Sequence, residues 1–130
     1  MFENYRCKSI FNRISDDDLR WYVDSIACNG NNENIKLCFP AEWEARIYVT
    51  AIIADLEIWR NLAELKPPLL LIRGDETNTF WSYTLKLFLK HLPKTQILIV
   101  PGTTHLAPME KPHLIASAIL GFIDGIHSKI

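Results

Sequence analysis

Residues 97–112 decide the fold, and they read I-L-I-V-P-G-T-T-H-L-A-P-M-E-K-P. The first four are apolar, as in a buried strand, and the run ends at Pro101-Gly102, a pair that punctuates a strand and starts a loop. His105 follows within that loop, and Pro112 precedes a periodic apolar segment. The stretch therefore predicts a strand, a loop that carries a histidine, and a helix.

His105 is a candidate general base. In open α/β sheets, ligands bind at the carboxyl ends of the strands, which is where this loop is expected. Histidine titrates near neutral pH, and that suits proton transfer. A single loop histidine is also commonly solvated or part of a helix cap, so the loop alone leaves both interpretations open.

The segment before this stretch predicts a β-α-β unit. Pro67-Pro68 ends a helix, and a continuous apolar run makes residues 68–73 a strand that is buried on both faces. An amphipathic helix is expected over residues 80–92 and a second strand over 96–100. The two strands should be adjacent and parallel. From residue 112 to 126, apolar residues recur as pairs at every turn, which predicts a helix with a broad buried face.

Residues 67–77 read P-P-L-L-L-I-R-G-D-E-T, and with residues 97–112 they resemble the C-terminal third of the α/β-hydrolase family. The H-x-x-P-x-E-x-P pattern of residues 105–112, joined to the preceding strand, carries most of the specificity. The resemblance implies a partial α/β-hydrolase fold, with a helical lid-like segment at 1–66 and the C-terminal part of the core at 67–130. It also implies that His105 matches the catalytic histidine of the family.

The N-terminal half predicts helices and one short extended piece. Ser15 and Asp18 can form a capping box for a helix that Asn29-Gly30-Asn31-Asn32 would end. Residues 35–39 alternate, and residues 41–65 predict either one long helix or two with a bend. The Trp and Tyr residues of this helical region are expected in the core rather than in a substrate pocket. Residues 37–45 resemble, more weakly, the lid of bacterial α/β-hydrolases.

A triad needs an acid that orients the histidine, and the loop after residue 73 should supply it. The family often carries this acid three or four residues after the glycine, where this chain has Thr77 and Asn78. Asp75 and Glu76 are the carboxylates of the loop. We rank Asp75 first, Glu76 second and Asn78 third, and a turn-forming role for Asp75 is an equal alternative.

The nucleophile of a serine hydrolase is not encoded in these residues, since no G-x-S-x-G elbow occurs. We therefore expect a C-terminal portion of a serine-hydrolase-type enzyme for an ester or related acyl substrate, inactive as an isolated chain. In the family's chain order the missing half would precede this one, as in a truncated product, a cloned fragment or a split protein. The alternative is a non-catalytic remnant or binding module of the same fold.

Composition narrows the class further. The 130 residues are 48% hydrophobic and 22% charged, with net charge −1, which excludes disorder and gives no sign of nucleic-acid binding. The apolar runs are too short for a bilayer. Neither a metal nor a cofactor is expected. Three cysteines, Cys7, Cys28 and Cys38, fit reduced thiols in a cytoplasmic protein better than a disulfide framework.

A parallel strand pair needs covered faces and managed edges. Without neighbouring strands, Leu69, Leu71, Ile97 and Ile99 should be partly exposed. We therefore expect a homodimer, or pairing with the missing N-terminal half. The alternative is that the helices of residues 15–65 fold back over the bare face.

Overall fold

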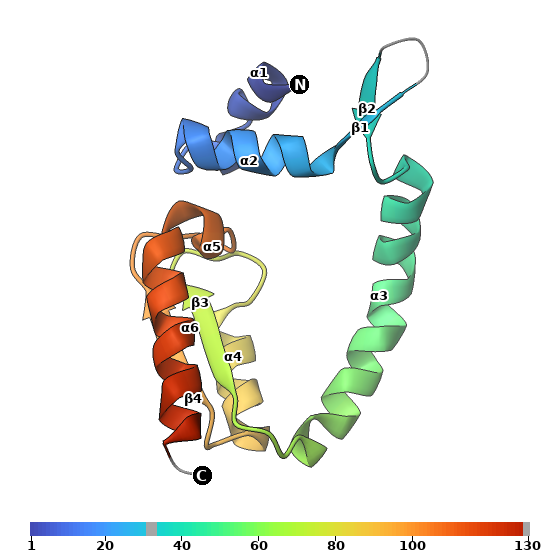
Figure 1. Cartoon of the computed structure of the whole chain (residues 1–130). Helices are drawn as coiled ribbons and strands as arrows, with labels where there is room; N and C mark the ends of the chain where they lie inside the picture. The colour runs from blue at the N-terminus through green and yellow to red at the C-terminus, as the bar shows by residue number, and fades with distance from the viewer. Residues whose placement is uncertain (31–33, 129–130) are drawn as a thin grey trace. The chain divides into compact units, whose positions relative to one another are not determined.

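A computed structural model describes residues 1–30 and 34–128 (Figure 1). The chain divides into two compact units, Met1–Arg60 and Asn61–Ile130. The expected helix terminator included Asn31 and Asn32, which lie outside the described residues. Within the described ranges, no helix has both the length and the apolar character needed to cross a bilayer.

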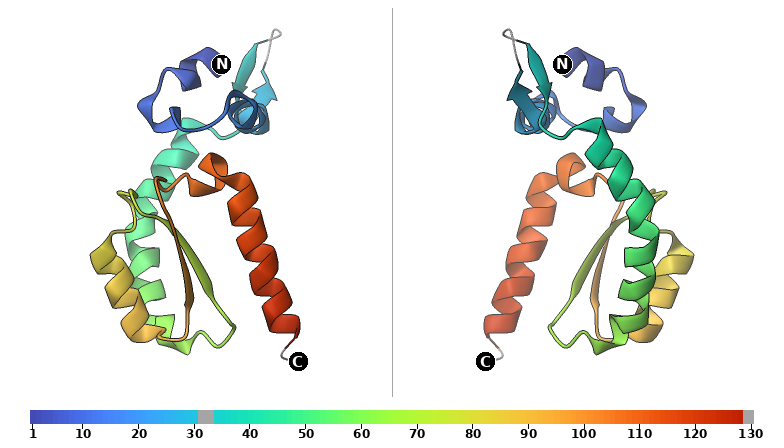
Figure 2. Two further views of the ribbon diagram at one scale, coloured as in Figure 1. Left: turned by 90° about the vertical axis from the view of Figure 1, so that its left-hand side faces the viewer. Right: turned by 90° about the vertical axis from the view of Figure 1, so that its right-hand side faces the viewer.

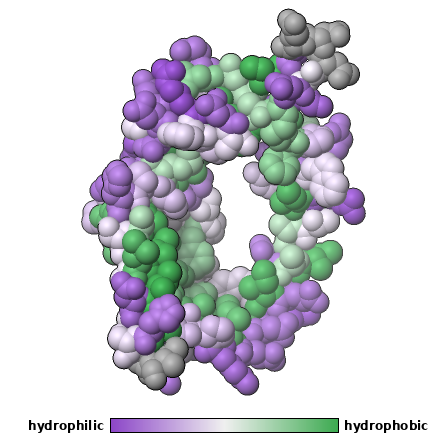
Figure 3. Space-filling model, viewed as in Figure 1, coloured by the Kyte–Doolittle hydropathy of each residue, from purple (hydrophilic) through white to green (hydrophobic). Residues whose placement is uncertain are grey.

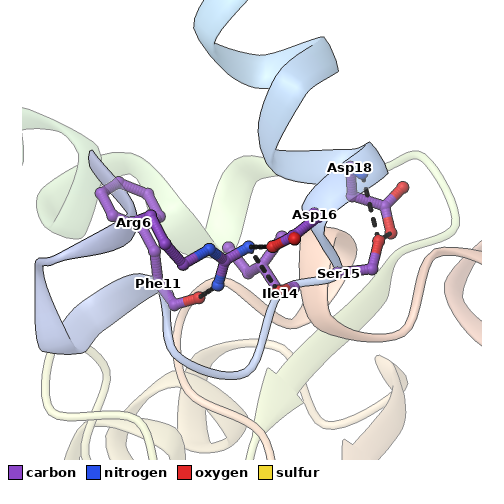
Figure 4. Close-up of polar contacts among 6 residues, drawn as sticks. All are labelled: Arg6, Phe11, Ile14, Ser15, Asp16 and Asp18. Atoms are coloured by element: carbon purple, nitrogen blue, oxygen red, sulfur yellow. Dashed lines mark hydrogen bonds and ion pairs between the residues drawn. The ribbon is translucent and has the colours of Figure 1, made fainter. Parts of the chain in front are cut away.

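The first unit begins with α1 (Phe2–Arg6), the 3-10 helix η1 (Ser9–Phe11) and α2 (Asp16–Ile26). Ser15 caps α2, because its hydroxyl accepts a hydrogen bond from the Asp18 amide at 3.1 Å (Figure 4). The expected capping box is modified: the Ser15 hydroxyl donates to the Asp18 carboxylate at 2.5 Å. Arg6 ties α1 to this cap through a 2.7 Å ion pair with Asp16. The aspartate run therefore stabilises the N-terminus of α2.

Arg6 also closes the loop between the two helices. Its guanidinium donates to the carbonyl oxygens of Phe11 and Ile14, each at 3.0 Å. Behind this loop lies the small core of the unit, where Leu19 is fully buried. Its other buried apolar residues are Phe11, Ile14 and Val23.

The sequence expectation fails at the end of α2. The helix stops at Ile26, and the chain continues as β1 (Ala27–Asn29), which pairs antiparallel with β2 (Ile35–Leu37). Cys28 and Cys38 form a disulfide across this hairpin, with their Cα atoms 5.1 Å apart. The prediction of reduced thiols is therefore wrong for these two cysteines, because the hairpin brings them together. Cys7 is free and exposed.

The region of residues 41–65 contains one continuous α-helix, α3 (Ala41–Asn61). The 3-10 helix η3 (Leu62–Glu64) follows it. Of the two alternatives, the single long helix is the observed one. The expectation that its aromatic side chains form core is wrong for Trp43 and Tyr48, which are 59% and 73% exposed. Helical periodicity identified an apolar side of this helix without identifying what covers it.

The second unit confirms the predicted β-α-β arrangement. β3 (Leu70–Gly74) and β4 (Gln96–Val100) are parallel, in register from Leu70 opposite Gln96 to Gly74 opposite Val100. α4 (Ser82–His91) connects them. After β4 come the short helix α5 (Ala107–Glu110) and α6 (Pro112–His127). α4 lies on one face of the strand pair and α6 on the other (Figure 2).

The core of this unit lies between the strands and α6. Val100, Ala107 and Ile115 are buried together, and Ile72 and Leu98 pack against them. Other hydrophobic residues along α6 remain open (Figure 3). They include Ile119, Leu120 and Ile123. On β4, Ile97 and Ile99 are 39% and 38% exposed. The unit thus leaves apolar surface uncovered on both a helix and a strand.

Candidate active site at the carboxyl ends of β3 and β4

Two loops meet where the parallel strands end. The amide of Asp75 donates to the carbonyl of Val100 at 3.2 Å, and the amide of Glu76 donates to the carbonyl of Thr103 at 3.0 Å. Gly74 allows this approach, because a Cβ there would overlap the carbonyl oxygens of Thr103 and Thr104. Main-chain contacts therefore hold the His105 loop beside the loop that follows β3.

The turn after β4 uses a glycine and a buried threonine. Gly102 has φ of 66°, a left-handed conformation that side chains disfavour. Thr103 is fully buried, and its hydroxyl donates to the carbonyl of Val100 at 2.8 Å. Pro101-Gly102 ends the strand, as the sequence predicted. The hydrogen bond of Thr103 holds the turn against the end of the strand.

Glu110 fastens the histidine loop from its other side. One carboxylate oxygen accepts from the Thr104 amide at 2.8 Å, and the other accepts from the Thr104 hydroxyl at 2.6 Å. The same hydroxyl accepts from the Leu106 amide at 3.1 Å. Both neighbours of His105 are thereby held. Sequence reasoning included this glutamate in the H-x-x-P-x-E-x-P pattern but gave it no role; the structure shows that it positions the loop.

His105 lies in the wall of a pocket of about 430 Å³. Its side chain is exposed, as expected for a loop at this edge of the sheet. Apolar residues of β3, α5 and α6 form much of the same wall: Leu71, Ile72, Ala107, Pro108, Ile115 and Ile119. A pocket with apolar walls and few polar groups is typical of small-molecule sites. The histidine is therefore placed where it can meet a bound ligand.

The candidate acids lie elsewhere in the β3 loop. Asp75 is exposed and its carboxylate accepts from the Thr103 amide at 3.3 Å, which is the turn-stabilising alternative for this residue. Glu76 and Asn78 are exposed as well. In the described part of the chain, none of the three lines the His105 pocket. The role of each as triad acid stays a prediction.

The polar residues of this loop that do line the pocket are threonines, and Phe80 contributes an aromatic ring. Thr77, which is 8% exposed, and Thr79 both contribute to the wall, and their hydroxyls lie 3.1 Å apart. Sequence reasoning noted Thr77 only as a departure from the family pattern. Thr77 lies three residues after Gly74, where the family often carries the acid, and this position could have indicated that Thr77 belongs to the site. The pocket thus combines an imidazole with neutral hydroxyls and with Arg73, whose Nε donates to the carbonyl of Phe80 at 2.7 Å.

Comparison with known proteins shows similarity of structure without similarity of sequence. No family model matches the chain, and no curated protein sequence matches it significantly. Among solved structures, the peroxisomal α/β-hydrolase Lpx1 from Saccharomyces cerevisiae matches 98% of this chain with a TM-score of 0.82 and 17% identity. E-2-(acetamidomethylene)succinate hydrolase matches 88% with a TM-score of 0.74 and 20% identity. A thioesterase domain from the curacin biosynthetic pathway matches 92% with a TM-score of 0.65 and 16% identity.

These likenesses establish the fold. The chain has part of the α/β-hydrolase architecture, as the resemblance of its C-terminal half predicted. It spans 41%, 33% and 40% of the lengths of the hydrolase, Lpx1 and the thioesterase domain, respectively.

Proposed function

We propose that this chain carries the general-base part of a serine-hydrolase-type α/β-hydrolase that acts on an ester or related acyl substrate. The observation that carries the proposal is the position of His105 in a largely apolar pocket at the carboxyl ends of two parallel strands. Glu110 holds Thr104 on one side of the histidine, and the Thr104 hydroxyl accepts from the Leu106 amide on the other side. The names of two similar structures, a hydrolase and a thioesterase domain, support acyl chemistry.

In this mechanism, the imidazole of His105 takes the proton of a hydroxyl nucleophile as that oxygen attacks the acyl carbon. It later returns the proton to the leaving group. The 130 residues contain no G-x-S-x-G elbow to provide the hydroxyl. An oxyanion hole is also needed, and removal of one donor from such a hole costs about 10²–10³ in rate. We therefore propose that the chain turns over no ester by itself.

The test is to read the coding sequence upstream of Met1 and to express the extended polypeptide with this chain. An in-frame G-x-S-x-G elbow, labelling of its serine by a fluorophosphonate, and loss of that labelling in His105→Gln are the expected results. Labelling of the 130-residue chain alone at any of its serines would contradict the proposal. So would an extended polypeptide whose esterase activity is unchanged in His105→Gln.

A second function, a non-catalytic binding module, has one observation in its favour. No carboxylate from the β3 loop lines the His105 pocket in the described residues, and threonine hydroxyls take that place. A binding module would hold an ester-like ligand in this pocket without cleaving it. Calorimetry with a short-chain ester separates the two functions, since a module binds the ester and leaves it intact even in the extended polypeptide.

We propose further that the chain associates, as a homodimer or with an N-terminal half. The exposed apolar side chains on β4 and along α6 support this, because burying apolar surface stabilises by about 25 cal/mol per Å². We favour the homodimer, since symmetric association is the commonest route. Sedimentation equilibrium at micromolar concentration tests it. A single 15.0 kDa species that does not grow with concentration would refute association.

The cellular compartment is a separate question. The cytoplasmic expectation rested on reduced thiols, and the Cys28–Cys38 disulfide removes that argument for two of the cysteines. Disulfides persist mainly in oxidising compartments. A cytoplasmic location therefore stays a prediction, and the test is alkylation of cell extracts: a cytoplasmic chain would have all its thiols alkylated without prior reduction.

A further inference from the structure

The first unit contains a separate pocket whose wall is rich in aromatic side chains. Its volume is about 310 Å³. Tyr5 of α1 and Tyr22 of α2 line it, together with Phe39 and with Trp43 of α3. Aliphatic residues of α2, β2 and α3 complete the wall. All of these residues belong to Met1–Arg60, so the pocket is independent of the His105 site and of the function proposed for it.

Two of the rings are held in place by a third. Tyr5 and Tyr22 meet edge to face, with ring centroids 5.9 Å apart. Phe11, which is 7% exposed, packs against both, at 5.5 Å from each centroid. Such offset and edge-to-face contacts are the favoured geometries of aromatic pairs. The tyrosine side of the pocket is therefore an ordered wall.

The disulfide fixes the opposite side. It joins Cys28 to Cys38, the residue next to Phe39, and the Cys38 amide donates to the carbonyl of Ile26 at 2.8 Å. This places Phe39 at the base of the hairpin, close to the start of α3. Phe39 is 70% exposed and Trp43 is 59% exposed, so both rings present open surface. The disulfide fixes the backbone beside Phe39, and open aromatic rings are suited to contact a ligand.

The wall of this pocket contains a carboxylate, and one of its rings, that of Trp43, already has a cation of the chain over it, the Arg46 guanidinium at 5.8 Å from the centroid. Glu44 of α3 is the charged residue of its wall. Burial raises the pKa of Tyr22, and the neighbouring Tyr5 and the negative Glu44 raise it further. The rings themselves attract cations: the Lys8 ammonium lies 4.3 Å from the centroid of Tyr5, although Lys8 is outside the lining set.

We propose that this pocket binds a small organic cation of the quaternary ammonium class. Aromatic faces attract such cations through the ring quadrupole, and clusters of aromatic rings are the usual sites for choline-like groups. A quaternary ammonium donates no N–H, so it needs ring faces and a nearby carboxylate rather than hydrogen-bond acceptors. The rings of Tyr5, Tyr22, Phe39 and Trp43 beside Glu44 provide both features.

The experiment is isothermal titration of the oxidised full chain with choline and with 3,3-dimethylbutan-1-ol, which has the same shape without the charge. We expect choline to bind at least about 10-fold more tightly than the neutral alcohol, a difference of the size that desolvated cation–π contacts provide. Equal affinities, or no choline binding at millimolar concentration, would overturn the proposal. Cosedimentation with phosphatidylcholine vesicles then distinguishes a lipid headgroup from a free cation as the source of the ammonium group.

A matched pair of variants separates the site from general electrostatics. Glu42 and Glu44 are both in the first turn of α3, and only Glu44 lines the pocket. Glu44→Gln should weaken choline binding by about 5- to 10-fold and leave the neutral alcohol unaffected. Glu42→Gln removes the same charge from the same helix end, and it should change choline binding less than about 2-fold. Equal losses in the two variants would refute a specific role for Glu44.

Discussion

Replacing Glu110 by alanine should release the loop that carries His105. The glutamate accepts two hydrogen bonds from Thr104, at 2.8 Å from the amide and 2.6 Å from the hydroxyl, and both residues are half-buried. Hydrogen bonds to a charged partner contribute about 1.5–3 kcal/mol each, and water can replace part of this at a half-buried site. We therefore expect the free energy of local opening of the His105 loop to fall by about 2–3 kcal/mol, so that the loop opens about 30- to 150-fold more often.

Amide hydrogen exchange measures this opening residue by residue. The amides of Thr104 and Leu106 should exchange faster in Glu110→Ala by that factor, because one donates to Glu110 and the other to the Thr104 hydroxyl. The Gln96 amide, which donates to the carbonyl of Leu69 at 2.9 Å at the start of β4, should keep most of its protection, since the change is local. Glu110→Gln keeps one carbonyl acceptor in place of two, and its effect should be intermediate.

The matched control is Glu64→Ala, because Glu64 is an exposed residue of η3 in the same unit. Exposed substitutions of this kind usually change stability by less than about 0.5 kcal/mol. Unchanged exchange of Thr104 in Glu110→Ala would refute the positioning role. Equal acceleration by Glu64→Ala would do the same, since it would mean that lost charge rather than lost hydrogen bonds opens the loop.

Three further predictions concern other features. Gly74→Ala should lower the free energy of unfolding, measured in urea, by about 3 kcal/mol, because the new Cβ overlaps backbone oxygens. Gly121→Ala, in open space on α6, should raise it by about 0.5–1 kcal/mol. A change of the same sign in both variants would contradict this. The double substitution Cys28→Ser/Cys38→Ser should destabilise the first unit by about 3 kcal/mol, because it removes a covalent link between residues 10 positions apart. Cys7→Ser should destabilise it much less, and thermal unfolding measures both changes. Because the folded chain holds the Tyr22 proton more tightly than the unfolded chain does, its unfolding free energy should fall as pH rises past about 10, less steeply in Tyr22→Phe; identical slopes would contradict this.

The β-α-β unit was predictable because its signals are local and strong. The strand Gln96–Val100 is mostly apolar and ends at Pro101-Gly102. Such a run is stable as a strand whose faces are covered by helices. Helix α6 begins at Pro112, where a missing amide costs nothing, and its paired apolar residues require a packed face. Neither inference needs knowledge of a distant partner.

Other features depend on distant partners, and there the sequence was a poor guide. Whether Cys28 and Cys38 pair depends on the pairing of β1 with β2, so spacing alone did not indicate the bond. Asp75 was a plausible acid by residue type, but its carboxylate accepts from the amide of Thr103, 28 residues further on. The apolar residues of α3 have helical periodicity, yet periodicity does not show that Trp43 is left open.

The junction at Gly74 has a consequence for how this site can change. The two loops meet mainly through main-chain atoms, so the junction requires the absence of a side chain at Gly74 and uses one side-chain contact, between the Asp75 carboxylate and the Thr103 amide. Exposed positions such as Asn78 are therefore free to accept other residues, while the path of the chain past His105 stays the same. This is a route by which proteins with 16% to 20% identity can keep a common edge of the sheet and exchange the chemistry displayed on it. For protein engineering, it marks the β3 loop as a place to graft new polar groups opposite a histidine whose position does not depend on them.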